Sequence, residues 1–111
     1  MKTKCCGGSL TGTVHDVGVR LNYILLKEEV RQGAQAIVTI CPLCQFNLDA
    51  YQAEIRKQTG EPIDMPILYL TQVVGWALGG SFRELGLHRA ISGRNLIEEW
   101  FTVKKEAETY V

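Results

Sequence analysis

The sequence is poor in the features that mark secreted, membrane-spanning or nucleic-acid-binding proteins. Its 111 residues include only four cysteines, three prolines and two histidines. No apolar run approaches the ~20 residues that a membrane-spanning helix needs, and no apolar segment typical of a signal peptide follows Met1. Basic and acidic residues balance at twelve each, so the basic excess of a nucleic-acid binder is missing. We therefore expect a cytoplasmic protein with no membrane span and no nucleic-acid partner.

The remaining composition is that of a soluble globular domain. Apolar residues make up 46% of the chain and charged residues 22%, close to the averages for folded domains. A disordered chain would contain fewer apolar residues and more charged ones. Since domains usually contain roughly 100–200 residues, we expect residues 1–111 to form a single domain.

Hydrophobic periodicity and breaker residues predict alternating helices and strands. The β-branched run Gln35–Ile40 is typical of a buried parallel strand; Pro66–Leu70 is a second candidate and Lys2–Cys5 a short third one. Helices are expected over about 14–32, 42–59 and 71–78 and from about 94 onward. This order predicts an α/β fold, with a small parallel sheet of two or three strands and flanking helices in a partial Rossmann-like layer.

The four cysteines form two tight clusters rather than a scattered disulfide framework. Cys5 and Cys6 precede two glycines, and Cys41 and Cys44 follow the strand predicted at Gln35–Ile40 in a Cys-Pro-Leu-Cys motif. Ligands of open α/β sheets bind at the carboxyl ends of the strands. If both clusters lie at such ends, they meet at one edge of the sheet. The amides of the glycine loop and of the helix turn after Cys41 then favour thiolates there.

The spacing by itself leaves four interpretations open. Thiolates fit an iron–sulfur centre. They also fit a structural zinc site with four sulfur ligands, which would make the protein an assembly module of a larger redox complex. Cys41 and Cys44 alone fit a metal-free, thioredoxin-type dithiol pair. In the fourth interpretation all four residues are ordinary buried cysteines.

The histidines and two aspartates suggest structural roles. His15 and His88 are expected to be surface or capping residues rather than metal ligands. Asp16 and Asp49 are expected in or near first helical turns, where a carboxylate favours the positive end of the helix. No side chain outside the cysteines therefore suggests catalysis.

Two stretches of the sequence carry a family resemblance. Cys5-Cys6-Gly7-Gly8-Ser9 and the segment Ala36–Asp49, which contains the Cys-Pro-Leu-Cys motif, together resemble the cysteine-rich CCG domain. This domain occurs in the B subunit of heterodisulfide reductase and in related subunits of succinate or fumarate reductases and of glycolate and lactate oxidation complexes. Pro66–Gly79 is also similar to the heterodisulfide reductase version, so the resemblance covers roughly residues 4–88.

The resemblance implies an iron–sulfur redox domain. In that family each motif has five cysteines, which bind a noncubane [4Fe–4S] cluster at which a disulfide is cleaved. Carried over, Cys5, Cys6, Cys41 and Cys44 are the cluster ligands, with no catalytic residue beyond them. The family's first cysteine lies well upstream of the pair, whereas only four residues precede Cys5 here. The chain therefore resembles the C-terminal half of one CCG domain.

The resemblance also implies partner subunits. An active chain would be an oxidoreductase subunit of the heterodisulfide reductase type, working only with redox subunits that carry iron–sulfur clusters or flavin. Aerobic purification is expected to leave its site empty. The helix over 14–32 has two apolar faces, one of them formed by Val17, Leu21 and Ile24, and a small sheet covers only one. The isolated chain is therefore expected to form homo-oligomers.

Overall fold

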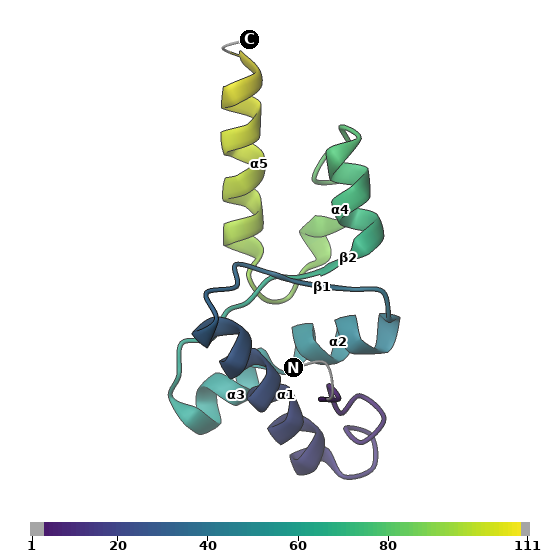
Figure 1. Cartoon of the computed structure of the whole chain (residues 1–111), viewed down its shortest axis with the longest axis vertical. Coiled ribbons are helices and arrows are strands. Elements are labelled where there is room, and N and C mark those ends of the chain that lie inside the picture. The colour runs from purple at the N-terminus through teal and green to yellow at the C-terminus, as the bar shows by residue number, and fades with distance from the viewer. Residues whose placement is uncertain (1–3, 110–111) are drawn as a thin grey trace.

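The computed structural model of the chain describes residues 4–109 and has a mixed α/β architecture (Figure 1). Its helices are α1 (His15–Arg31), α2 (Pro42–Ala50), α3 (Gln52–Thr59), α4 (Leu70–Ala77), the 3₁₀ turn η1 (Leu87–Arg89) and α5 (Arg94–Thr109). Its strands are β1 (Ile37–Thr39) and β2 (Ile67–Tyr69). In Figure 1, α1, α2 and α3 lie on one side of the strands, while α4 and α5 project from the other. This arrangement confirms the predicted fold class.

The sheet consists, within residues 4–109, of two parallel strands. β1 pairs with β2 so that Ile37 lies opposite Ile67 and Thr39 opposite Tyr69. Parallel strands need a crossover connection, which α2 and α3 provide. The predicted third strand at Lys2–Cys5 is wrong where it can be compared, because Lys4 and Cys5 have irregular backbone; Lys2 and Thr3 lie outside the described residues.

Strand β1 is less buried than the sequence predicts. Ile67 and Leu68 of β2 are almost fully buried, but Val38 of β1 is 49% exposed and Ile40, just beyond it, is 81% exposed. β1 pairs on one side only, so the described residues leave its other edge open. The expectation of a buried strand at Gln35–Ile40 is therefore wrong for β1. Val38 and Ile40 are exposed, and within the described residues one edge of β1 has no neighbouring strand.

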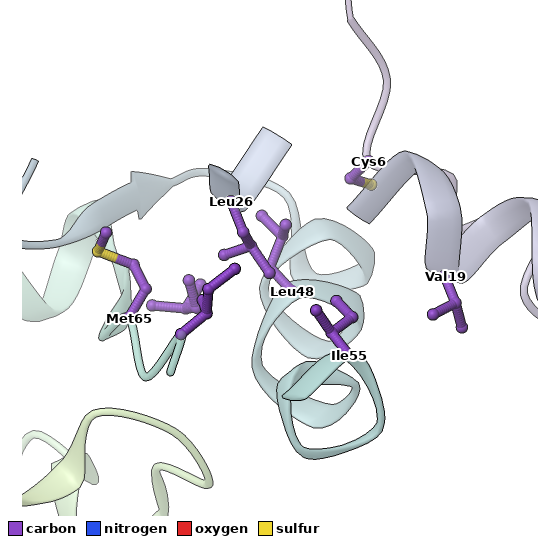
Figure 2. Close-up of a cluster of buried hydrophobic side chains, with 8 residues drawn as sticks. Cys6, Val19, Leu26, Leu48, Ile55 and Met65 are labelled. Atoms are coloured by element: carbon purple, nitrogen blue, oxygen red, sulfur yellow. The ribbon is translucent and has the colours of Figure 1, made fainter. Parts of the chain in front are cut away.

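The main apolar core lies on the α1 side of the sheet. In Figure 2, Leu26 of α1, Leu48 of α2 and Ile55 of α3 lie between Met65 and Val19. Each of these five side chains is at most 5% exposed. Full burial of such a side chain contributes about 1.5–3 kcal/mol, so this cluster fixes how the three helices face one another.

The helix predicted over 42–59 is divided at Tyr51 (φ −97°, ψ 3°). The Gln52 side chain explains the break. Its Nε2 donates to the Leu48 carbonyl at 3.0 Å, the acceptor that a continuous helix offers to the Gln52 backbone N–H. The same amide donates to the Met65 carbonyl at 2.8 Å and accepts from the Met65 N–H at 2.7 Å. The break therefore ties α3 to the segment that leads into β2.

The other side of the sheet carries a smaller core around α4 and α5. Its buried members are Leu68, Leu87 and Ile97. An aromatic stack extends this cluster, with the Trp76 and Phe101 rings 4.7 Å apart and inclined by 18°. Lys104 of α5 donates to the Trp76 carbonyl at 3.1 Å. These contacts connect the two projecting helices.

Two carboxylates fix the backbone that leads into α5. Asp49, in the last turn of α2, accepts from the N–H groups of Ser92 (2.8 Å) and Ile91 (3.1 Å). Asp64 accepts from the Gly93 N–H at 2.9 Å. Burial raises the pKa of Asp49, and the two amides oppose that rise. The expectation that Asp49 lies in or near the first turn of its helix is wrong, because Asp49 lies in the last turn of α2 and its carboxylate binds the backbone that leads into α5.

Large apolar side chains remain exposed on the described surface. Val17 and Ile24 are exposed on the second face of α1 that the sequence predicts to lack cover. A second group follows the end of β1 and comprises Ile40, Leu43 and Phe46. None of the helices within residues 4–109 is both long and apolar enough to cross a membrane.

Gly93 gives a direct test of the packing between the start of α5 and β2. It has φ +65°, and a Cβ there would lie 2.4 Å from the Pro66 nitrogen. Gly93→Ala combines left-handed strain of about 1–2 kcal/mol with overpacking of about 1–3 kcal/mol, and should lower the free energy of unfolding by their sum. Urea denaturation measures this loss.

Gly60→Ala is the matched control. Gly60 also has positive φ (+72°), but a Cβ there would meet nothing within 4 Å. This variant should show the strain alone, about 1–2 kcal/mol. Equal losses for the two variants would contradict the close approach of Gly93 to Pro66.

Candidate metal and redox site

The Cys-Cys-Gly-Gly loop over residues 5–8 packs closely against α1 and α2. Gly7 has φ +76°, and a Cβ on it would lie 3.0 Å from the carbonyl oxygen of Gly18 in α1. A Cβ on Gly8 would lie 2.9 Å from Cγ of Leu43 in α2. The two glycines therefore allow an approach that a larger residue would prevent.

Two buried asparagines hold this loop against the helices. Asn47 Nδ2 donates to the Cys6 carbonyl at 2.7 Å, and Asn22 Nδ2 of α1 donates to the Asn47 backbone carbonyl at 2.6 Å. Both side chains are at most 1% exposed, and neither Oδ1 atom has a hydrogen-bond partner among residues 4–109. Unpaired buried oxygens are rare in folded proteins, and these two lie on the network that fixes Cys6.

The network brings Cys6 to the second cysteine cluster. The Cys6 thiol donates to Cys44 Sγ at 3.3 Å, although the two residues are 38 positions apart. Cys6 is buried, while Cys44 and Cys41, the residue before α2, are half-buried. The predicted convergence of the two clusters is therefore confirmed for Cys6 and Cys44.

Cys5 is placed differently from its neighbour. It is exposed, and its sulfur accepts from the Gly7 N–H at 3.4 Å. Within the described residues, no group of three or more His, Cys, Asp or Glu side chains is arranged to hold a metal ion. The donor chemistry fits a thiophilic metal. The Cys44 sulfur contacts those of Cys6 and Cys41, whereas the Cys5 sulfur accepts from the Gly7 N–H. The assignment of all four cysteines as ligands stays a prediction.

The pKa values of the two half-buried cysteines, Cys41 and Cys44, are shifted in opposite directions. The backbone N–H of Cys44 faces the Cys41 sulfur and, with the Cys44 thiol, lowers the pKa of Cys41. Burial, followed by the neighbouring thiols of Cys6 and Cys41, raises the pKa of Cys44 to about 12. Cys41 therefore loses its proton more readily than Cys44.

A pocket of about 330 Å³ begins one residue beyond Cys44. Gln45 and Phe46 of α2 line it together with Tyr69 at the end of β2 and Arg89 of η1. It runs along β2, because Ile67 and Tyr69, the first and last residues of that strand, both line it.

The two histidines lie apart from the sulfurs. His15 is exposed and its Nε2 lies 3.0 Å from Glu54 Oε2; this hydrogen bond, more than the one to the Thr11 carbonyl, raises the pKa of His15. The expectation of a surface histidine is confirmed. His88 is half-buried, and its Nδ1 has no hydrogen-bond partner within the described residues.

The Cys-Cys-Gly loop and the Cys-x-x-Cys helix start lie in a segment that matches a known protein family. Residues 1–49 match the cysteine-rich domain CCG. This part of the chain belongs to the CCG cysteine-rich domain family. All four cysteines lie inside the matched CCG region, as do Asn22 and Asn47, whose hydrogen bonds hold the loop. The predicted family membership is thus confirmed.

Three relatives extend the similarity beyond residue 49. The chain is 33% identical over 96 residues, or 86% of its length, to the 8-methylmenaquinol:fumarate reductase membrane anchor subunit of Wolinella succinogenes. It is 29% identical over 79% of its length to the B subunit of the ferredoxin:CoB-CoM heterodisulfide reductase of Methanosarcina mazei. A protein of Archaeoglobus profundus, named as similar to the heterodisulfide reductase B subunit, is 34% identical over 68% of the chain. The matched region spans 34%, 30% and 26% of these relatives respectively.

Asn22 and Asn47 are not among the residues predicted from the sequence to form the site. A signal was nevertheless present, because Asn22 lies four residues from both Gly18 and Leu26 on the buried stripe of α1. Asn47 likewise lies three residues beyond Cys44, next to the buried Leu48. A polar amide on an otherwise apolar helix face indicates a buried hydrogen-bond partner.

Asn47→Ala should loosen the loop that carries Cys6. The substitution leaves the buried Cys6 carbonyl without its donor, which costs about 1–3 kcal/mol of unfolding free energy. It should also make the Cys6 thiol react faster with an alkylating reagent. Chemical denaturation and mass spectrometry of the alkylated peptide measure the two effects. Asn95→Ala, which changes an exposed asparagine, is the control. If Cys6 in Asn47→Ala reacts no faster than in the wild type, Asn47 does not hold the loop.

Proposed function

We propose that this chain is an iron–sulfur redox module in which Cys5, Cys6, Cys41 and Cys44 hold a noncubane [4Fe–4S] cluster. The observation that carries the proposal is the 3.3 Å contact between Cys6 and Cys44 inside a CCG domain. It joins the two halves of the cysteine motif in one place. The proposed activity is electron transfer or disulfide reduction as part of a larger complex.

The donor set supports iron rather than a hard cation. Thiolate sulfur is the preferred ligand of iron–sulfur centres, whereas magnesium and calcium prefer oxygen. No carboxylate contacts Cys6 or Cys44 in the hydrogen bonds and ion pairs found within residues 4–109. When bound, the cluster would supply the electron-accepting and electron-donating centre.

The protein's own residues would prepare the site before any metal arrives. Asn47 holds the Cys6 carbonyl, and Thr39 Oγ1 accepts from the Cys41 N–H at 3.2 Å, which fixes Cys41 at the end of β1. The first turn of α2 presents amides that favour negative charge on sulfur. Exposed Cys5 would be the ligand with most freedom to adjust, because among residues 4–109 the contact found for its sulfur is the one with the Gly7 N–H.

The names of the relatives support a role within a larger assembly. One is named a membrane anchor subunit of a fumarate reductase and another a subunit of a heterodisulfide reductase. We infer that this chain, too, works with redox subunits that carry iron–sulfur clusters or flavin, in the cytoplasm. It would supply one cysteine-rich domain to that assembly.

Anaerobic reconstitution tests the metal. The chain, incubated with ferrous iron and sulfide under reducing conditions, should bind both and absorb visible light. Cys6→Ser and Cys44→Ser should each reduce the bound iron strongly, because each removes a central donor. Ser9→Ala changes an exposed residue of the same region and should retain wild-type iron binding. Stoichiometric zinc without visible absorbance would contradict the iron proposal and favour a structural zinc module.

The open strand edge predicts association of the chain. Ile40 and Val38 expose apolar surface next to unpaired backbone of β1, and zero net charge does not oppose contact. Sedimentation at micromolar concentration should show dimers or larger species. Ile40→Lys should shift the population toward monomer, because a lysine protects a strand edge. Exposed Gln35→Lys is the charge-matched control, and a monomeric wild-type chain would contradict the prediction.

A further inference from the structure

His15, the first residue of α1, faces hydrogen-bond acceptors at both of its ring nitrogens. Nδ1 lies 3.3 Å from the carbonyl oxygen of Thr11. Nε2 lies 3.0 Å from Oε2 and 3.1 Å from Oε1 of Glu54 in α3. Thr11 precedes α1, whereas Glu54 lies 39 positions beyond the histidine. The ring therefore connects the loop before α1 to α3.

Only the protonated ring can donate to both acceptors. A neutral imidazole has one N–H group and one lone pair, whereas the imidazolium has two N–H groups. If Nδ1 holds the single proton, the lone pair of Nε2 faces the Glu54 carboxylate. If Nε2 holds it, the lone pair of Nδ1 faces the Thr11 carbonyl. Loss of one proton therefore replaces one of the two attractive contacts of His15 with a repulsive one.

Thr11 joins His15 to the Cys-Cys-Gly-Gly loop. The Thr11 Oγ1 donates to the Gly8 carbonyl at 2.9 Å, and the Thr11 N–H donates to the Gly7 carbonyl at 3.1 Å. Thr11 also packs against α1, because a Cβ on Gly18 would lie 2.5 Å from Thr11 Cγ2. Both glycines of the loop thus bond to the residue that His15 holds.

The groups around His15 favour its protonated form. Glu54 faces the ring from α3, and Asp16 lies next to it in the first turn of α1. The Tyr51 ring, between α2 and α3, makes an edge contact with a centroid distance of 5.3 Å. The hydrogen bond to Glu54, followed by the one to the Thr11 carbonyl, raises the pKa of His15, and the charges of both carboxylates add to the rise. These contacts oppose the positive end of α1, which disfavours a cation.

We infer that His15 is a proton-sensitive link between the Cys-Cys-Gly-Gly loop and α3: the charged ring holds the loop, and the neutral ring loosens it. Since folding favours the charged ring, the restraint is complete at acidic pH and is lost as the pH rises through the titration of His15. The mobility of the loop that carries Cys5 and Cys6 would then depend on pH through a residue that is not a cysteine. This inference goes beyond the proposed iron–sulfur function and does not require it.

Hydrogen–deuterium exchange of the full chain, reduced and free of metal, tests the inference. The reporters are the N–H groups of Thr11 and Val14. They donate to the Gly7 and Leu10 carbonyls at 3.1 and 2.7 Å. Their protection, corrected for the pH dependence of intrinsic exchange, should fall about two- to fivefold between about pH 5.5 and about pH 8.5, as for an exposed ion pair lost on histidine titration. NMR spectra of the His15 ring should give the same midpoint.

Neutral variants identify the group responsible. His15→Gln and Glu54→Gln should each flatten the pH response of the protection, because the first removes the titrating ring and the second removes its carboxylate partner. Glu98→Gln is the control. It neutralises a carboxylate that pairs with Arg94 in α5, and it should keep the wild-type response.

Protection that does not change with pH in the wild type would overturn the inference. A change that persists in His15→Gln would overturn it too, because another group, such as a cysteine thiol, would then be responsible. If His15→Gln does not fold, the wild-type chain still decides the matter, since a protection midpoint different from that of the His15 ring contradicts the link. Because no iron is present, either result is independent of iron reconstitution.

Discussion

The hydrogen bond from the Asn47 side chain to the Cys6 carbonyl is the contact on which the cysteine site depends. The Cys-Cys-Gly-Gly loop belongs to no strand in the described chain, so sheet pairing does not position Cys6. Asn47 replaces that pairing with a 2.7 Å bond to α2, and Asn22 extends the contact to α1. The bond is buried, where a lost partner is costly. It therefore determines whether the two cysteine clusters meet.

The small sheet positions the other half of the site. β1 ends at Thr39, and Cys41 is the N-cap residue that precedes α2. Parallel pairing with β2 fixes the direction of this strand, and Pro42 begins the helix without leaving an unpaired N–H. The sulfur of Cys41 thus faces the amides at the N-terminus of α2, where negative charge is favoured. A thiolate-bound metal centre would benefit from this placement.

Local patterns predict the elements well, because periodicity and turn residues act over short distances. The parallel strands and the helix start at Pro42 follow from such patterns. The spacing also predicts that the two cysteine clusters meet, but the contact of Cys6 with Cys44 depends on the tertiary bond from Asn47. The break at Tyr51 does not, since it depends on Gln52 reaching Met65, which lies beyond α3. Long-range contacts of this kind are not encoded in any one window of sequence.

Long-range contacts also explain the other differences between the sequence predictions and the structure. Asp49 bonds to backbone 43 positions away at Ser92, a partner that no helix-capping rule indicates. The apolar residues of β1 have the composition of a buried strand, but burial requires a neighbour that the described residues do not supply. Cys5 shares a motif with Cys6, yet only Cys6 has a buried anchor. Spacing thus predicts which cysteines can meet, and tertiary contacts decide which ones do.

X-ray absorption at the iron edge tests the central claim that the two cysteine clusters form one thiolate site. The measurement uses the full chain loaded with iron and sulfide under anaerobic conditions, and it reports the atoms bound directly to iron. Our account predicts sulfur neighbours and an iron–iron scattering signal. Both should be lost in Asn47→Ala, because that variant lacks the hydrogen bond from Asn47 to the Cys6 carbonyl. Iron surrounded by oxygen or nitrogen would contradict the account.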